Sequence, residues 1–315
     1  MASKIGAELA SWARLDYSTK WSRKDYSKPQ YLDGHFYHNI ARRWPTCPVI
    51  DPNGYYMNEM EIYELEQGGL YENHNDEFTQ QLKFTFTPLE GWNLYAEGAL
   101  RVTNNKTTQN QIPVYYYGVE GQPMLRDSDY GTVTNAYDSR FRQNYYALNL
   151  FTDYTRSFGK HNGKILVGFN YERYNQDSMS GRGYNLTTSD KPFLSQTQQN
   201  FSISDSYWNR ATAGFFGRLN YDYDGKYLAE FNLRYDGSSR FTEDNRWAWF
   251  PSVSLGWNIA REEFFEKLSE TVGTLKLRGS WGQLGNTSSN YDSFWDWYPF
   301  YQQQSTGSNN SGWLI

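Results

Sequence analysis

The chain has 315 residues and a net charge of -5, and 38% of its residues are hydrophobic while 19% are aromatic. The negative charge argues against a nucleic-acid backbone as the main partner, and the single cysteine, Cys47, excludes an internal disulfide framework and a cysteine metal cluster. No stretch approaches the roughly 18 consecutive apolar residues of a membrane-spanning helix, and the amino terminus lacks the basic and apolar segments of a secretory signal.

Alternation of apolar and polar residues predicts about nine β-strands along the chain. Several have about ten residues, which is close to the length that a tilted strand needs to cross a bilayer. In most of them one face is apolar and the other is polar and often charged. The strands are expected near residues 14–24, 78–87, 92–102, 144–156, 164–174, 211–222, 227–235, 247–259 and 274–282.

The connections between these strands alternate in length. Residues 87–92, 158–164 and 223–226 are short and rich in Gly, Pro, Asp and Asn, which predicts tight turns. The link at 260–273 is of middle length and is expected to contain a helical turn. Long polar segments, which we expect to be loops, lie at 25–77, 103–143, 175–210, 236–246 and from 283 to the end. Short turns at one rim and long loops at the other are typical of transmembrane β-barrels.

Large aromatic residues recur at the strand ends, as expected for the aromatic girdle of a membrane barrel. They are Trp92, Tyr221, Tyr227, Tyr235, Trp249 and Trp257. We therefore predict an all-β fold that is part of a transmembrane antiparallel barrel, with its apolar faces covered by lipid. The alternative is a soluble β-sandwich or propeller, which also shows alternation but accounts poorly for charged residues on the second face of nearly every strand.

Three segments of the last third carry a family resemblance: "GFFGRLNYDYDGKYLAEFNLRYDGSSRF" (214–241), "NRWAWFPSVSLGWNIAREEFF" (245–265) and "LKLRGSWGQLGN" (275–286). They closely resemble the SusC/RagA family of TonB-linked outer-membrane receptors, and "RRWPTCPVIDPNGYY" (42–56) is similar to a loop of that family. The resemblance implies that residues 1–315 are part of a 22-strand barrel. We find no match to the family's signal peptide, amino-terminal domain, TonB-contacting segment or plug domain.

The resemblance further implies energy-coupled import of a glycan or a similar bulky oligomer across the outer membrane of a Gram-negative bacterium. It implies two partners, a SusD-like surface lipoprotein and the TonB complex. The polar residues of the strands would then line the channel or contact the plug: Lys83, Glu97, Arg101, Arg218, Glu230 and Arg234.

Two aromatic loop segments are candidates for contacting a glycan, an oligopeptide or a partner's surface, because flat rings stack on sugar rings and neighbouring polar groups bind hydroxyls. The alternative is packing of one loop on another over the barrel mouth. The candidate residues are Trp295, Trp297, Tyr298 and Tyr301 in one segment and Tyr115 and Tyr116 in the other.

No catalytic constellation or cofactor-binding motif is found, so we expect neither an enzyme nor a cofactor. His35, His38 and His74 lack the spacing of a tetrahedral metal site. Two other interpretations stay open at this point: a soluble carbohydrate-binding β module, and a truncated receptor without function.

Overall fold

The computed structural model describes residues 1–32, 34–46, 48–57, 62–117, 121–125, 134–266 and 272–285. Most of these residues belong to one ten-stranded antiparallel sheet. The strands lie side by side in the order in which the chain forms them, with β5 and β6 set apart in a separate sheet, so the large sheet is a simple meander with β1 and β12 at its edges. Its strands are β1 (Ala2–Ala10), β2 (Ala13–Pro29), β3 (Leu70–Leu89), β4 (Trp92–Gln111), β7 (Asn135–Phe158), β8 (His161–Leu186), β9 (Thr197–Tyr223), β10 (Tyr227–Ser238), β11 (Trp247–Asn258) and β12 (Lys276–Gly282).

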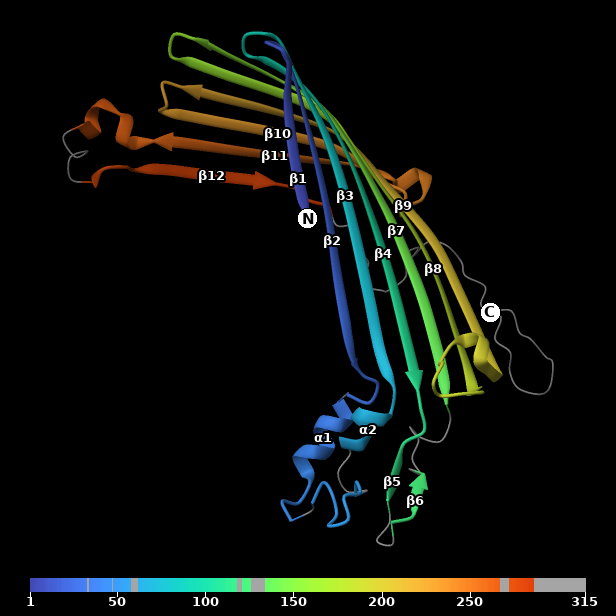
Figure 1. Cartoon of the computed structure of the whole chain (residues 1–315). Helices are drawn as coiled ribbons and strands as arrows, with labels where there is room; N and C mark the ends of the chain where they lie inside the picture. The colour runs from blue at the N-terminus through green and yellow to red at the C-terminus, as the bar shows by residue number, and fades with distance from the viewer. Residues whose placement is uncertain are drawn as a thin grey trace.

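The sheet is strongly curved, and its two ends differ (Figure 1). The tight turns lie at one end, and two short helices with a two-stranded sheet lie at the other. These smaller elements are α1 (Gly34–Arg42), α2 (Ile62–Gln67), β5 (Tyr115–Tyr117) and β6 (Pro123–Leu125). The remaining elements are single 3-10 turns: η1 (Leu194–Gln196), η2 (Glu243–Asn245), η3 (Ile259–Arg261) and η4 (Glu263–Phe265). A search of the described helices finds none with the length and apolarity needed to span a bilayer.

The all-β fold and all nine predicted strands are confirmed. The sequence analysis missed β1, although Ile5, Ala7 and Leu9 do alternate with polar or small neighbours. The helical turn expected in the link after β11 is present as η3 and η4.

The prediction that the long polar segments are mainly loops is wrong. Six strands run far into them and reach 17 residues in β2, 20 in β3 and β4, 24 in β7, 26 in β8 and 27 in β9. In most of these extensions both faces are largely polar, so the alternation that identifies a half-buried strand is lost while the backbone pairing continues. The exception is β9, where Phe201, Ile203 and Tyr207 lie on the outward face. The long connections that remain are residues 30–69 and 112–134, with shorter ones at 187–196 and 239–246.

One face of the sheet carries an apolar band whose slope gives the tilt of the strands. The last apolar pair of the band is Phe78 opposite Val102 on β3 and β4, but Tyr235 opposite Trp249 on β10 and β11. Paired residues lie in rows perpendicular to the strands, and the row through Tyr235 crosses β3 six residues away from Phe78. That row is Phe84, Ala96, Leu150, Phe169, Phe215 and Tyr235.

Six residues correspond to about 20 Å along a strand, accumulated over five strand spacings of about 4.8 Å each. A band edge parallel to a membrane plane therefore requires a strand tilt of about 40°, which is within the range of roughly 35–45° for membrane barrels. The edge of the band therefore runs obliquely across the strands, as it does in a barrel whose strands are tilted.

The six predicted girdle aromatics lie on the apolar face, at the two ends of this band. Tyr227 stands opposite Trp257 near the tight turns, and Tyr235 stands opposite Trp249 at the other end, with their rings stacked at a centroid distance of 4.4 Å. The indole of Trp92 donates a hydrogen bond of 2.8 Å to Thr152. Eight residues separate Tyr227 from Tyr235, about 26 Å along the strand, and with a tilt of about 40° this is a band about 20 Å tall, somewhat less than the roughly 25 Å typical of membrane barrels.

The loops at the far end of the long strands pack on each other around a small core. Tyr31, Tyr63 and Val114 are buried there, and Tyr56 and Tyr116 pack against them. The loop at 30–69 is joined to the β4–β7 connection by backbone hydrogen bonds, from Tyr117 N–H to the Tyr56 carbonyl (3.1 Å) and from Ile112 N–H to the Gly68 carbonyl (3.2 Å). The predicted packing of loop on loop is therefore present in this part.

Gly237 tests how closely the aromatic end of the band is packed. A Cβ at this position would lie 2.6 Å from the ring of Trp247, which stacks on Tyr235 at 5.0 Å. We expect Gly237→Ala to lower the free energy of unfolding by about 1–3 kcal/mol, because the overpacked ring must move. The measurement is denaturant unfolding of the full receptor in detergent.

Gly98→Ala is the matched control, because Gly98 lies in the same row and a Cβ there meets no atom within 4 Å. Equal stability of the two variants would show that the packing at Trp247 does not constrain this site.

Candidate functional site: the polar concave face

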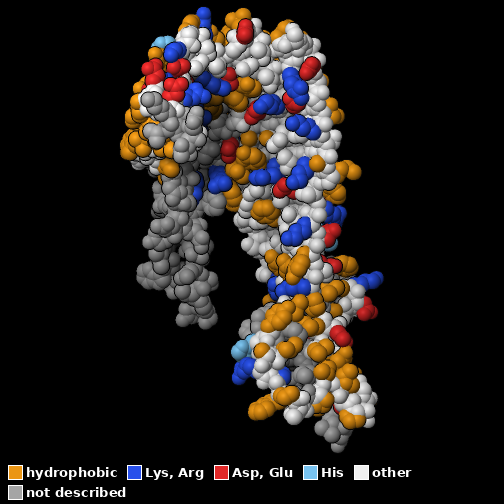
Figure 2. Space-filling view, turned by 90° about the vertical axis from the view of Figure 1, so that its left-hand side faces the viewer, with side chains coloured by type: hydrophobic (Ala, Val, Ile, Leu, Met, Phe, Trp, Pro, Cys, Tyr) orange, Lys and Arg blue, Asp and Glu red, His pale blue; other side chains and the backbone are white. Residues whose placement is uncertain are grey.

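The face opposite the apolar band is the concave one, and it carries the charges. Figure 2 looks onto this side, where basic and acidic side chains lie beside one another along the strands. The register places all six predicted channel residues here: Lys83, Glu97, Arg101, Arg218, Glu230 and Arg234.

Most of these charges are satisfied by a neighbour on the next strand or two residues along the same strand. Lys83 Nζ lies 2.8 Å from a carboxylate oxygen of Glu97. Arg234 donates two hydrogen bonds of 2.9 Å to the two carboxylate oxygens of Asp236. At these pairs the charges balance one another locally, and the face as a whole is strongly polar.

A stack of two arginines and two tyrosines crosses four strands of this face. The guanidinium of Arg101 lies 5.0 Å from the ring of Tyr145, which is 4.6 Å from the ring of Tyr174. On the other side, Arg210 lies 4.4 Å from Tyr174. The sequence analysis found only Arg101, because the other three become partners only through the register of β4, β7, β8 and β9.

A second aromatic row lies closer to the tight turns. Tyr95 stacks on Phe151 at 4.5 Å, and Lys83 stands 5.0 Å from the Tyr95 ring. Gly168 follows in the row, and a Cβ there would meet both Phe151 and Phe216 at under 3 Å. Only a glycine at this position leaves room for the side chains of Phe151 and Phe216 on either side of it.

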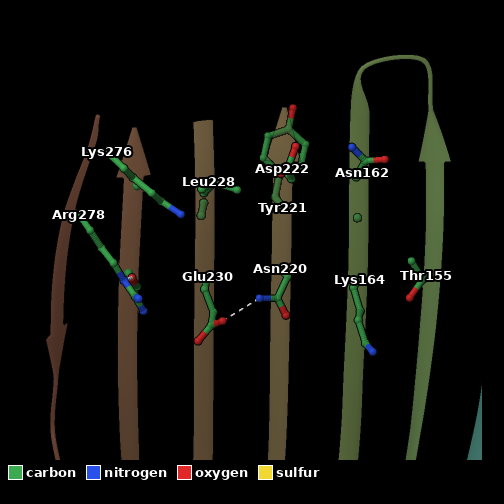
Figure 3. A pocket seen from close by; sticks show the side chains of 14 residues that line it. Thr155, Asn162, Lys164, Asn220, Tyr221, Asp222, Leu228, Glu230, Lys276 and Arg278 are labelled. Atoms are coloured by element: carbon green, nitrogen blue, oxygen red, sulfur yellow. Dashed lines mark hydrogen bonds between the residues drawn. The ribbon is translucent and has the colours of Figure 1, made fainter. Parts of the chain in front are cut away.

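A hollow of about 370 Å³ opens on this face near the tight turns (Figure 3). Glu230 accepts hydrogen bonds from the amides of Asn220 (2.7 Å) and Asn232 (2.9 Å), which are its direct partners. Lys164 is 3.4 Å from Asp153, and Arg278 donates to the Ser254 hydroxyl at 3.4 Å. The hollow is lined by Lys164, Asn220, Glu230, Ser254, Lys276 and Arg278, among others, and suits an anionic or hydroxyl-bearing group.

The predicted loop aromatics are only partly within the described residues. Tyr116 packs against Tyr63 of the loop core, at a ring distance of 6.3 Å, whereas Tyr115 is 44% exposed. Trp295, Trp297, Tyr298 and Tyr301 lie outside the residues that the structure describes. Of the two tyrosines, Tyr115 is the one presented to solvent.

Within the described ranges, no group of three or more His, Cys, Asp or Glu side chains is arranged to hold a metal ion. The ring of His74 is 2.6 Å from Asp25, and that of His38 is 2.9 Å from Arg42. Both histidines thus have ordinary side-chain partners.

The turn at Asp51 is expected to be more stable at neutral pH than at acidic pH. Its carboxylate accepts backbone N–H bonds from Tyr55 (2.8 Å) and Asn53 (2.9 Å). The Tyr55 bond is the main reason that the pKa of Asp51 is lowered, and Tyr55 in turn stacks on Tyr117 at 4.6 Å. A lowered pKa means that the stabilisation is present above the unfolded value and is lost as the pH falls through the folded value.

We therefore expect the Tyr55 amide to exchange its hydrogen faster at about pH 3 than at about pH 5, after correction for the intrinsic rate. Hydrogen exchange of the full receptor measures this. Asp51→Asn is the control and should remove the pH dependence; protection that stays constant in the native protein would contradict the assignment.

Comparison with known proteins agrees with this architecture. The profile of the family "TonB dependent receptor-like, beta-barrel" matches residues 11–312. The TonB-dependent receptor SusC of Bacteroides thetaiotaomicron is 30% identical over 272 residues, covering 76% of this chain and 25% of SusC. The TonB-dependent receptor P26 of Formosa agariphila is 28% identical over 270 residues, covering 79% of this chain and 26% of that receptor.

Among solved structures, the RagAB peptide importer in its open-open state aligns with a TM-score of 0.75 at 21% identity, covering 99% of this chain and 34% of the importer chain. The chain thus spans about a quarter of the length of these two receptors and a third of that structure. The structural likeness shows the fold, and the family profile spans nearly the whole sequence. This chain belongs to the TonB-dependent receptor family, and its sheet is part of the β-barrel of that family.

Proposed function

We propose that this chain is part of the barrel wall of an outer-membrane receptor that imports a glycan or a similar bulky oligomer into a Gram-negative bacterium. The observation that carries the proposal is the two-faced sheet, apolar on its outside and charged on its concave side over ten continuous strands. Such a wall separates lipid from a polar interior.

In this proposal residues 1–315 supply a partial barrel, and the plug, the amino-terminal domain and the signal peptide belong to other parts of the receptor. The paired charges and the aromatic rows of the concave face line the path or contact the plug. Energy comes from the TonB complex, and a SusD-like lipoprotein closes the outer mouth. The similarity to a receptor named SusC supports these partners.

The exposed apolar side chains favour this function over a soluble carbohydrate-binding module. Phe215, Leu219 and Leu255 are 54%, 52% and 60% exposed on one face of the sheet. Contiguous apolar surface of this extent is rare in soluble monomers and requires lipid or a partner.

The substrate-binding role is assigned to the loop aromatics, with Tyr115 presented to solvent and Trp295, Trp297, Tyr298 and Tyr301 placed in the same role by their sequence alone. An aromatic face and neighbouring hydroxyl and amide groups fit a sugar chain. An oligopeptide is the second candidate substrate, because the barrel also shares its fold with a structure described as a peptide importer.

The test is uptake by cells that carry the full receptor, measured separately with glycan oligomers and with oligopeptides. We expect Tyr115→Ala combined with Trp295→Ala and Trp297→Ala to lower glycan uptake by about ten-fold or more, because replacing one ring of an aromatic stacking platform by alanine costs about 1–3 kcal/mol. Tyr207→Ala is the matched control, because Tyr207 is 66% exposed on the outward face of the sheet. Full uptake by the triple variant would remove the aromatic site, and uptake independent of TonB would remove the import function.

A further inference from the structure

The outward face of the sheet changes character directly beyond the apolar band. On β2 the band ends at Trp21 and is followed by Arg23, and on β3 it ends at Phe78 and is followed by Asp76. On β4 and β7 it continues into Lys106, Arg140 and Arg142. Register places all of these on the same face as the lipid-facing band and not on the concave side.

Three cations lie near one another on two neighbouring strands here, with Asp177 of β8 on the other side of Arg142. Lys106 is directly opposite Arg140 in the β4–β7 pairing, and Arg142 is opposite Asn104, two positions along. Like charges directly opposite each other destabilise a sheet. Arg140 has a carboxylate partner, Asp138 at 3.3 Å, but among the described residues Lys106 and Arg142 have no carboxylate oxygen within 4.0 Å.

The same three cations line a hollow of about 720 Å³ on this face, together with Arg23, His74, Asp76 and Asp177. Two of the carboxylates near these cations already have partners. Asp25 pairs with His74 at 2.6 Å and with Arg23 at 3.0 Å, and Asp76 lies 3.9 Å from Arg23. An anion between Lys106, Arg140 and Arg142 would relieve their mutual repulsion.

The height of the hollow identifies the source of that anion. Lys106 lies four residues beyond Val102, and Arg142 four residues beyond Tyr146, which is about 13 Å along a strand. With a tilt of about 40° this places the backbone about 10 Å above the apolar band, just beyond a headgroup layer about 5–8 Å thick. Lysine and arginine side chains are long enough to reach down into that layer.

We propose that Lys106, Arg140 and Arg142 bind the phosphate of an anionic lipid headgroup in the outer leaflet, holding the barrel wall at a fixed depth. The inference rests on the proposed function for the placement of the wall in a membrane, but it assigns no part in substrate transport to these residues.

The test uses the full receptor reconstituted in vesicles of phosphatidylcholine with and without phosphatidic acid, followed by native mass spectrometry of the retained lipids. We expect phosphatidic acid to be retained in preference, and K106Q/R140Q/R142Q to lose about five-fold or more of that preference. The control K4Q/K20Q/K24Q removes the same charge from the opposite, concave face and should keep it. Should the triple variant not fold, R142Q alone should show a smaller loss in the same direction.

Unchanged preference in the folded variants would overturn the proposal. Saturation of the site by inorganic phosphate alone, with no preference among lipids, would overturn it too, because the ligand would then be a soluble anion. TonB-dependent uptake is measured on the same variants: a receptor that retains lipid but imports nothing contradicts the proposed function and not this site, and the reverse result contradicts the site alone.

Discussion

The pairing of every strand with its neighbour is the constraint on which the rest of this structure depends. Inside a bilayer no water satisfies a backbone N–H or carbonyl group, so each strand must find its partners on the strands beside it. β7 and β8 meet this requirement over their whole length, from Asn135 opposite Tyr184 to Phe158 opposite His161 without a shift in register. A slip of one residue anywhere would turn the whole strand over and place its charges in lipid.

The register also explains why the two faces can be so different. On the outer face, Ile165, Leu219 and Phe231 line up across three strands, and on the concave face Lys164, Asn220 and Glu230 line up beside them. Each of these polar side chains thereby lies close to other polar groups with which it can form hydrogen bonds or ion pairs. The polar side chains of the concave face therefore find their partners within the sheet. Among the residues that the structure describes, the buried aromatic cluster lies in the loops and not against the sheet.

Period-two alternation was enough to predict the strands where one face is apolar, because there the pattern reflects a real difference between lipid and water. It could not predict the parts of β3, β4, β7, β8 and β9 that extend beyond the apolar band, away from the tight turns. There both faces meet water, and residues such as Thr103, Asn104 and Thr107 give no alternation. The polar concave face followed from parity within each strand, so Lys83 and Arg234 were placed on the correct face. The stack of Arg101, Tyr145, Tyr174 and Arg210 required the pairing between strands, which a single sequence does not contain.

The extended strands change what kind of surface the outer part of the barrel offers. On β7 the sheet continues from Tyr146, at the edge of the band, to Asn135, about 36 Å further along the strand. The loop core of Tyr31, Tyr63 and Val114 is thus carried on paired strands well away from the membrane, and is itself tied down by hydrogen bonds between connections. Flexible loops would lose much conformational freedom on closing around a bulky oligomer, which weakens binding. A wall of paired strands has given up that freedom during folding, so in the proposed function it offers an ordered support for the connection that carries Tyr115 on β5.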